Sequence, residues 1–130
     1  MDHLVQKAVR DLLVAASGVT DLVAQRVYDN VPRTAALPYL TIGDDQLLDV
    51  SDGNGRRAEI FATVNAWAEG PDRVEVKQVA SAVVDALEAD LTITGWRCKV
   101  ATHVTTRYPR EPDGVTARAI IEFRYQLERI

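Results

Sequence analysis

The stretch RAEIFATVNAWAEGPDRVEVKQVASAVVDAL, residues 57–87, changes its hydrophobic pattern in the middle, at Gly70-Pro71. From Arg57 to Trp67 small apolar residues alternate with other residues, which predicts a strand that is buried on at least one side. After the break at Gly70-Pro71-Asp72 the apolar residues keep helical spacing up to Leu87, which predicts a helix. A strand followed at once by an amphipathic helix indicates a mixed α and β domain.

The residues before this stretch predict a helix, a loop and a strand. Apolar residues recur at spacings of three and four from Leu4 to Ala16, so we expect a helix that ends at Gly18, with a short further helical turn within residues 19–27. Prolines delimit an extended loop over residues 32–38, and a strand follows at residues 39–42. The Asp- and Gly-rich residues 43–55 favour a long, mobile, exposed hairpin loop.

The residues after it predict two more strands. Residues 96–108 and 115–127 alternate, and Pro112-Asp113-Gly114 is typical of the turn between them. In the first of the two, Cys98, Val100 and Val104 share the inward face. The order of elements predicts an α+β fold, with a four-stranded, mostly antiparallel sheet and two main helices packed on one face. We expect a single domain over residues 1–130, without internal repeats.

Composition limits the classes of function. The net charge of −4 and the pI near 5.1 argue against a dedicated, sequence-specific nucleic-acid binder, which normally carries a basic surface. We expect neither a signal peptide nor a membrane-spanning helix, because no long apolar run occurs. The single cysteine, Cys98, can form no disulfide within the chain, which suits a reducing cytoplasm.

The sequence gives little sign of catalytic chemistry. His3 lies near the terminus and His103 falls on the polar side of its strand, so we expect both to be solvated. Cys98 is expected to be an inert packing residue, since no base is indicated beside it. Neither a nucleophile elbow nor a phosphate-binding glycine loop occurs. We therefore expect no catalytic residue, no cofactor and no metal.

Two charged regions are candidates for binding. Asp49, Asp52 and Asn54 offer the hard oxygens that calcium prefers, but the downstream glutamate of a calcium loop is missing, and a flexible turn explains these residues better. Near the last turn, arginines alternate with acidic residues, which favours a solvated or partner-facing surface; they are Arg107, Arg110, Arg118 and Arg124, with Glu111, Asp113 and Glu122.

The order of several short motifs resembles the family of small tail-completion proteins of long-tailed phages and gene transfer agents, formerly a domain of unknown function. The motifs span nearly the whole chain. They are Arg26-Val27-Tyr28-Asp29 with Val31-Pro32, Pro38-Tyr39-Leu40-Thr41-Ile42-Gly43, the strand from Arg57 to Trp67, the helix from Val74 to Leu87, Pro112-Asp113-Gly114, and Phe123-Arg124.

The resemblance implies a non-enzymatic tail terminator of a virion or prophage, assembled in the bacterial cytoplasm. Its copies would form a hexameric ring that caps the tail tube and joins it to the head-tail connector protein, while DNA passes through the ring. We expect two polar segments, residues 43–55 and residues 107–114, to be the docking elements, since long loops on a rigid sheet are where partners are met. Their candidate residues are Asp44, Asp45, Asp49, Asp52, Asn54, Arg107, Arg110 and Asp113.

Other interpretations stay open at this point. A small α+β enzyme or ligand-binding module with an unidentified pocket could share the architecture, because fold does not fix function. An antitoxin-like regulatory protein that binds a small partner protein is a further alternative. Phe61 and Trp67 could belong either to a second core layer or to a subunit interface, and packing within the monomer is the simpler expectation.

Overall fold

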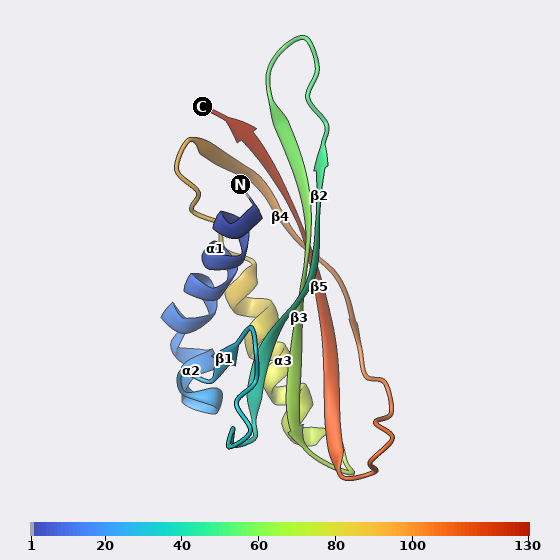
Figure 1. Ribbon diagram of the computed structural model, residues 1–130. Coiled ribbons are helices and arrows are strands. Elements are labelled where there is room, and N and C mark those ends of the chain that lie inside the picture. The colour runs from blue at the N-terminus through green and yellow to red at the C-terminus, as the bar shows by residue number, and fades with distance from the viewer. Residues whose placement is uncertain (1) are drawn as a thin grey trace.

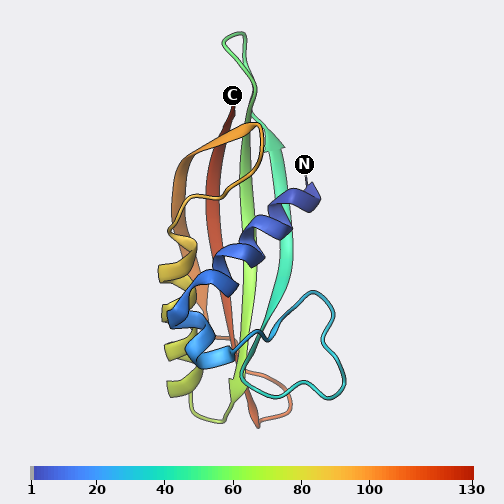
Figure 2. The same cartoon turned by 90° about the vertical axis from the view of Figure 1, so that its left-hand side faces the viewer.

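The structure, a computed structural model, describes residues 2–130 and has two layers. A twisted five-stranded sheet, in the order β1-β2-β3-β5-β4, forms one layer, and three helices cover one of its faces (Figure 1 and Figure 2). The elements are α1 (Asp2–Ala15), α2 (Ser17–Val23), β1 (Val27–Tyr28), β2 (Tyr39–Asp49), β3 (Arg57–Glu69), α3 (Val74–Leu87), β4 (Trp96–Arg107) and β5 (Thr116–Arg129). The predicted α+β class, with the helices on one face, is confirmed.

The core lies between the helices and the two central strands, β3 and β5. These strands pair over their whole length, from Arg57 opposite Glu128 to Glu69 opposite Thr116. Their alternating apolar residues are buried on the helix side, where α3 contributes five further buried side chains, Val76, Val79, Ala80, Val83 and Leu87. Burial of this apolar surface is the main force that holds the two layers together.

One buried polar contact ties the helix layer to the sheet. The Tyr125 hydroxyl donates a hydrogen bond of 2.7 Å to the carbonyl oxygen of Leu87, in the last turn of α3. That carbonyl has no partner within the helix, because the last four carbonyls of any helix lack one. Burial raises the pKa of Tyr125, so its phenol stays protonated and keeps donating.

The prediction of a long loop over residues 43–55 was wrong in its first half. Strand β2 continues through this region to Asp49, with a β-bulge between Ile42 and Asp45. Gly43 permits the bulge, because a Cβ atom there would lie only 2.8 Å from the side-chain nitrogen of Asn65. The Gly-Asp-Asp sequence thus marks an irregularity within a strand, and the loop itself is only residues 50–56.

The predicted element count was also incomplete. The fifth strand, β1, has two residues, Val27 and Tyr28, and pairs in parallel with Leu40 and Thr41. The predicted short helical turn is a complete helix, α2, and it contains Gly18, because the break after α1 falls at Ala16. Among residues 2–130, no helix combines the length and the apolar character needed to cross a membrane.

Strand β4 departs from the simple alternation that its sequence suggests. Register shifts at Cys98/Val100 and at His103/Thr105 each change which residues face the helices. Cys98 keeps its inward position opposite Leu127, but Val104 is 46% exposed. His103 is exposed, as predicted, yet it lies opposite Phe123 on the helix side, with the two ring centroids 5.4 Å apart. The predicted inward positions of Val100 and Val104 were therefore wrong, and the second shift restores the predicted alternation, with Thr106 opposite the buried Ile121.

Candidate docking surface

The candidate docking residues lie in three places around the sheet. Asp44, Asp45 and Asp49 belong to strand β2, although they were expected in a loop. Asp52 and Asn54 lie in the arm tip, our name for residues 50–56, which connects β2 to β3 and projects beyond the rest of the sheet (Figure 1). Arg107, Arg110 and Asp113 lie at the opposite end, at the end of β4 and in the β4–β5 loop, residues 108–115.

The arm tip is held by its own side chains. The Arg57 guanidinium donates to both carboxylate oxygens of Asp52, at 3.0 and 3.2 Å, and the backbone N–H of Asn54 donates to the same carboxylate at 2.8 Å. The Ser51 hydroxyl accepts a hydrogen bond from the backbone N–H of Arg57 at 3.0 Å. These contacts predict an ordered arm, which differs from the mobile loop expected from composition, and ordered loops lose less entropy on binding.

Asp49 also stabilises the arm tip. Its carboxylate accepts a hydrogen bond of 2.9 Å from the backbone N–H of Ser51, and interaction with Ser51 lowers the pKa of Asp49. Within residues 2–130, no three His, Cys, Asp or Glu side chains come together as ligands of a metal ion. Asp49 and Asp52 therefore have a role in loop structure that needs no bound calcium.

The β4–β5 loop is fixed in a comparable way. The Asp113 carboxylate accepts hydrogen bonds from the backbone N–H groups of Val115 and Thr116, both at 2.9 Å, and from the Thr116 hydroxyl. These bonds, led by that of the Thr116 hydroxyl, lower the pKa of Asp113. Gly114 has a φ of +69°, a conformation that glycine adopts without strain. The predicted Pro-Asp-Gly turn is thus part of a defined loop.

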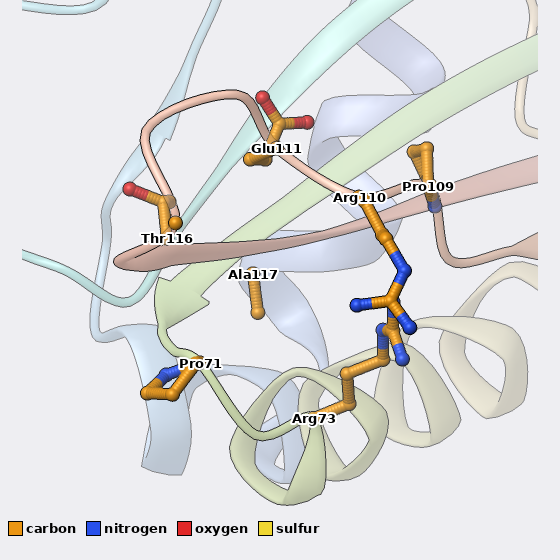
Figure 3. A pocket seen from close by; sticks show the side chains of 8 residues that line it. Pro71, Arg73, Pro109, Arg110, Glu111, Thr116 and Ala117 are labelled. Atoms are coloured by element: carbon orange, nitrogen blue, oxygen red, sulfur yellow. The ribbon is translucent and has the colours of Figure 1, made fainter.

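A basic hollow lies between this loop and the start of α3. Arg73 and Arg110 line it with Pro71, Pro109 and Glu111 (Figure 3). The Glu111 carboxylate forms an ion pair of 3.8 Å with Arg118, which leaves the two arginines as the excess charge of the hollow. Within the described chain, neither arginine has an ion-pair partner. Two positive charges that line one hollow favour an acidic group on a partner. Arg73 was missed from the sequence, because only the fold brings it next to Arg110.

The face of the sheet that faces away from the helices is open, and its polar residues are organised. The Arg118 guanidinium lies 4.8 Å from the Trp67 ring centroid and donates to the side-chain oxygen of Asn65 at 3.0 and 3.3 Å. Trp67 stacks on Tyr39, with 6.4 Å between ring centroids, and donates to the Thr41 hydroxyl at 3.1 Å. Trp67 therefore packs within the monomer, on the open face.

Phe61 lies on the same open face and is half-buried. Its partner on β5 is Arg124, which forms an ion pair of 3.1 Å with Glu59. Exposed apolar side chains continue along β2 and into the arm tip, with Leu48 at 39% and Val50 at 45% exposure. Their exposure could not be predicted, because the sequence places them in a region that resembles a polar loop.

The residues considered for catalysis do not form a site. Burial raises the pKa of the Cys98 thiol, so the thiol stays protonated and is a poor nucleophile. His103 shares a contact of 2.7 Å with the Thr106 hydroxyl, and His3 is on the exposed side of α1. Cys98 and His103 lie on the same strand, but a register shift separates them.

Comparison with known proteins now identifies the family. The family model described as "Tail completion protein gp17" matches residues 7–128. A chain of the native gene transfer agent (GTA) virion has a similar structure, with a TM-score of 0.85 and 28% identity over 95% of this chain and 93% of that one. The gp17 protein of bacteriophage SPP1 shares the fold, with a TM-score of 0.62 and 23% identity over 95% and 88% of the two chains.

No curated protein sequence matches the chain. The family match nevertheless covers nearly the whole domain, and it agrees with the resemblance carried by the motifs from Arg26 to Phe123-Arg124. The predicted absence of enzymatic activity is confirmed by the nature of the family. The chain therefore belongs to the tail completion protein gp17 family, as a structural, non-enzymatic protein of the tail of a phage or a phage-like gene transfer particle.

Proposed function

We propose that this chain is the subunit of a hexameric ring that caps the tail tube and joins it to the head-tail connector. One observation carries the proposal: two ordered polar loops, the arm tip and the β4–β5 loop, lie at opposite ends of one sheet (Figure 1). A ring whose axis runs along the strands would present the two loops on its two opposite faces. One face would meet the tube and the other the connector.

The ring would stop tube growth because its two faces differ. The arm tip is a narrow hairpin with exposed Val50, whereas the opposite end carries the basic hollow of Arg73 and Arg110. A face that complements the last tube subunit accepts the tube, and the other face offers no site for another tube subunit. DNA would pass through the centre without base-specific contact, consistent with the net charge of −4.

Shortening the arm tip tests the docking role. Replacing residues 51–56 by a two-residue Asn-Gly turn keeps Val50 beside Arg57, in register with the pair Asp49 and Ala58. The variant should fold, because the deleted residues contribute no buried core side chain. We expect the count of joined particles to fall by at least an order of magnitude when tails that lack this protein are mixed with heads and the variant, since a few interface residues supply most of the binding energy. Negative-stain microscopy gives this count.

Asp113→Ala is the matched variant at the other end, because it removes the carboxylate that orders the β4–β5 loop. Both variants should fail to join heads to tails, but at different steps. The variant whose altered loop meets the connector should leave tubes of normal length that carry the ring without a head. The variant whose altered loop meets the tube should leave uncapped tubes. Normal joining by both variants would contradict the proposal.

A further inference from the structure

The two edges of the sheet carry opposite charge. Strand β2 (Tyr39–Asp49) has three aspartates and no basic residue, and strand β4 (Trp96–Arg107) has two arginines and a lysine and no acidic residue. Among the described residues, β1 covers only Leu40 and Thr41 of β2, and no strand lies on the outer side of β4. Both charged edges therefore face outward, on opposite sides of the molecule.

Near the arm tip, the charged residues of the two edges lie at the same height, that is, at the same position along the strand direction. Reading the paired residues across β2, β3, β5 and β4, Asp49 is level with Cys98. Arg97 and Lys99 flank that position, and both are exposed. The Lys99 ammonium lies 3.7 Å from the Glu128 carboxylate of the same chain, so Arg97 supplies most of the positive charge that a second copy would meet at this level. A rotation about an axis along the strands preserves height, so it would bring Asp49 of one copy to the level of this basic pair on the next.

The charges in the middle of the two edges lie at neighbouring levels, which the long arginine side chain can span. Asp45 is level with His103, and Arg107 is level with Thr41. Asp44 follows Thr41 and precedes Asp45 along β2, so its height lies between those of Arg107 and His103. Asp44 and Arg107 are both exposed. Complementary charges thus occur at two separate levels, which is what a specific contact between copies requires.

The shape of β4 argues for a contact through side chains. Its two register shifts, together with its arginines and lysine, interrupt the straight edge that a continuous intermolecular strand ladder needs. A contact between unlike edges of identical chains is head-to-tail, and such contacts close into rings when the rotation per subunit suits. A second copy of this chain therefore fits each edge.

We infer that the acidic β2 edge of one copy binds the basic β4 edge of the next, and that this contact closes the ring. The inference rests on the proposed ring function and names the surfaces that build it. Because the contact depends on exposed charges, added salt should weaken it, since the screening length falls to about 10 Å at 0.1 M.

Charge reversal at each edge tests the contact. The acidic-edge variant is Asp44→Lys with Asp49→Lys, and the basic-edge variant is Arg97→Glu with Arg107→Glu. Each variant presents like charges to its own copies, so we expect self-association at low salt to weaken by about tenfold or more. Sedimentation velocity and native mass spectrometry, at the highest soluble concentration, measure the association.

Mixing the two charge-reversal variants should restore the charge match between neighbouring copies. An equal mixture of the two variants offers opposite charges at every contact, so it should form rings in which the variants alternate, provided that the ring has an even number of subunits. A single chain with all four substitutions should also associate like the wild type. A control with Glu75→Lys and Asp85→Lys on α3 has the same net charge as the acidic-edge variant, and it should associate normally.

Three results would overturn the inference. The first is normal association of both single-edge variants, the second is a mixture and a four-substitution chain that stay apart, and the third is a wild-type chain that remains monomeric at low salt. The joining assay with the shortened arm tip is independent of these results. If the charge-reversal variants associate normally and the shortened arm tip still prevents joining, the tail role stands and another surface builds the ring.

Discussion

Removing the ring of Phe123 should lower the free energy of unfolding by about 3–5 kcal/mol, the usual cost of truncating a buried aromatic residue. Phe123 is 0% exposed and stacks on Tyr125, with ring centroids 5.9 Å apart. It lies in β5, opposite Ala62 of β3, in the middle of the helix-facing core. Phe123→Ala would leave a cavity that the small neighbour Ala62 cannot fill.

Urea unfolding followed by circular dichroism measures this loss as a lower midpoint with an unchanged slope. Val104→Ala is the control, because Val104 is 46% exposed on the neighbouring strand, and surface substitutions usually change stability by no more than about 0.5 kcal/mol. An effect of Phe123→Ala as small as that of the control would contradict the position of the core between α3 and the sheet.

Leu40→Ala should cost about 2–5 kcal/mol and also release strand β1. Leu40 is 0% exposed, pairs with Val27 of β1 and with Ala66 of β3, and donates its backbone N–H to the carbonyl of Arg26 at 2.9 Å. Its side chain thus anchors the place where the two-residue strand joins the sheet. Leu40→Ala should therefore accelerate hydrogen exchange more in β1 than in β3.

Leu48→Ala provides a matched control on the same strand, since Leu48 is 39% exposed. We expect this variant to keep nearly the wild-type stability and the wild-type exchange rates of Val27 and Tyr28. Equal destabilisation by Leu40→Ala and Leu48→Ala would argue against the pairing of β1 with β2.

The long periodic elements could be predicted from the sequence because their patterns are local. The alternation of β3 and β5 and the helical spacing of α3 follow from the need to bury one face of each element. Strand β1 could not be predicted in this way. Two residues show no period, and their pairing depends on a contact with Leu40 that only the complete fold provides.

The bulges explain the other differences. A bulge at Gly43 lets β2 pass through a sequence that resembles a loop. The first of two bulges in β4 reverses the faces that simple alternation assigns, and the second restores them. The same irregularities changed the candidate site: Asp44, Asp45 and Asp49 became an edge of the sheet. The sequence could therefore name candidate docking residues, whose docking role stays a prediction, but it could not give their arrangement into edges and ends.

Cryo-electron microscopy of tail tubes incubated with the purified chain, with and without heads, is the most direct test of a role at the end of the tail. We expect a closed ring of this chain at the head-proximal end of each tube, with the arm tip on one face, the β4–β5 loop on the other, and β2 of each copy beside β4 of the next. Density for the chain along the shaft, at the distal tip or in the capsid would contradict that role.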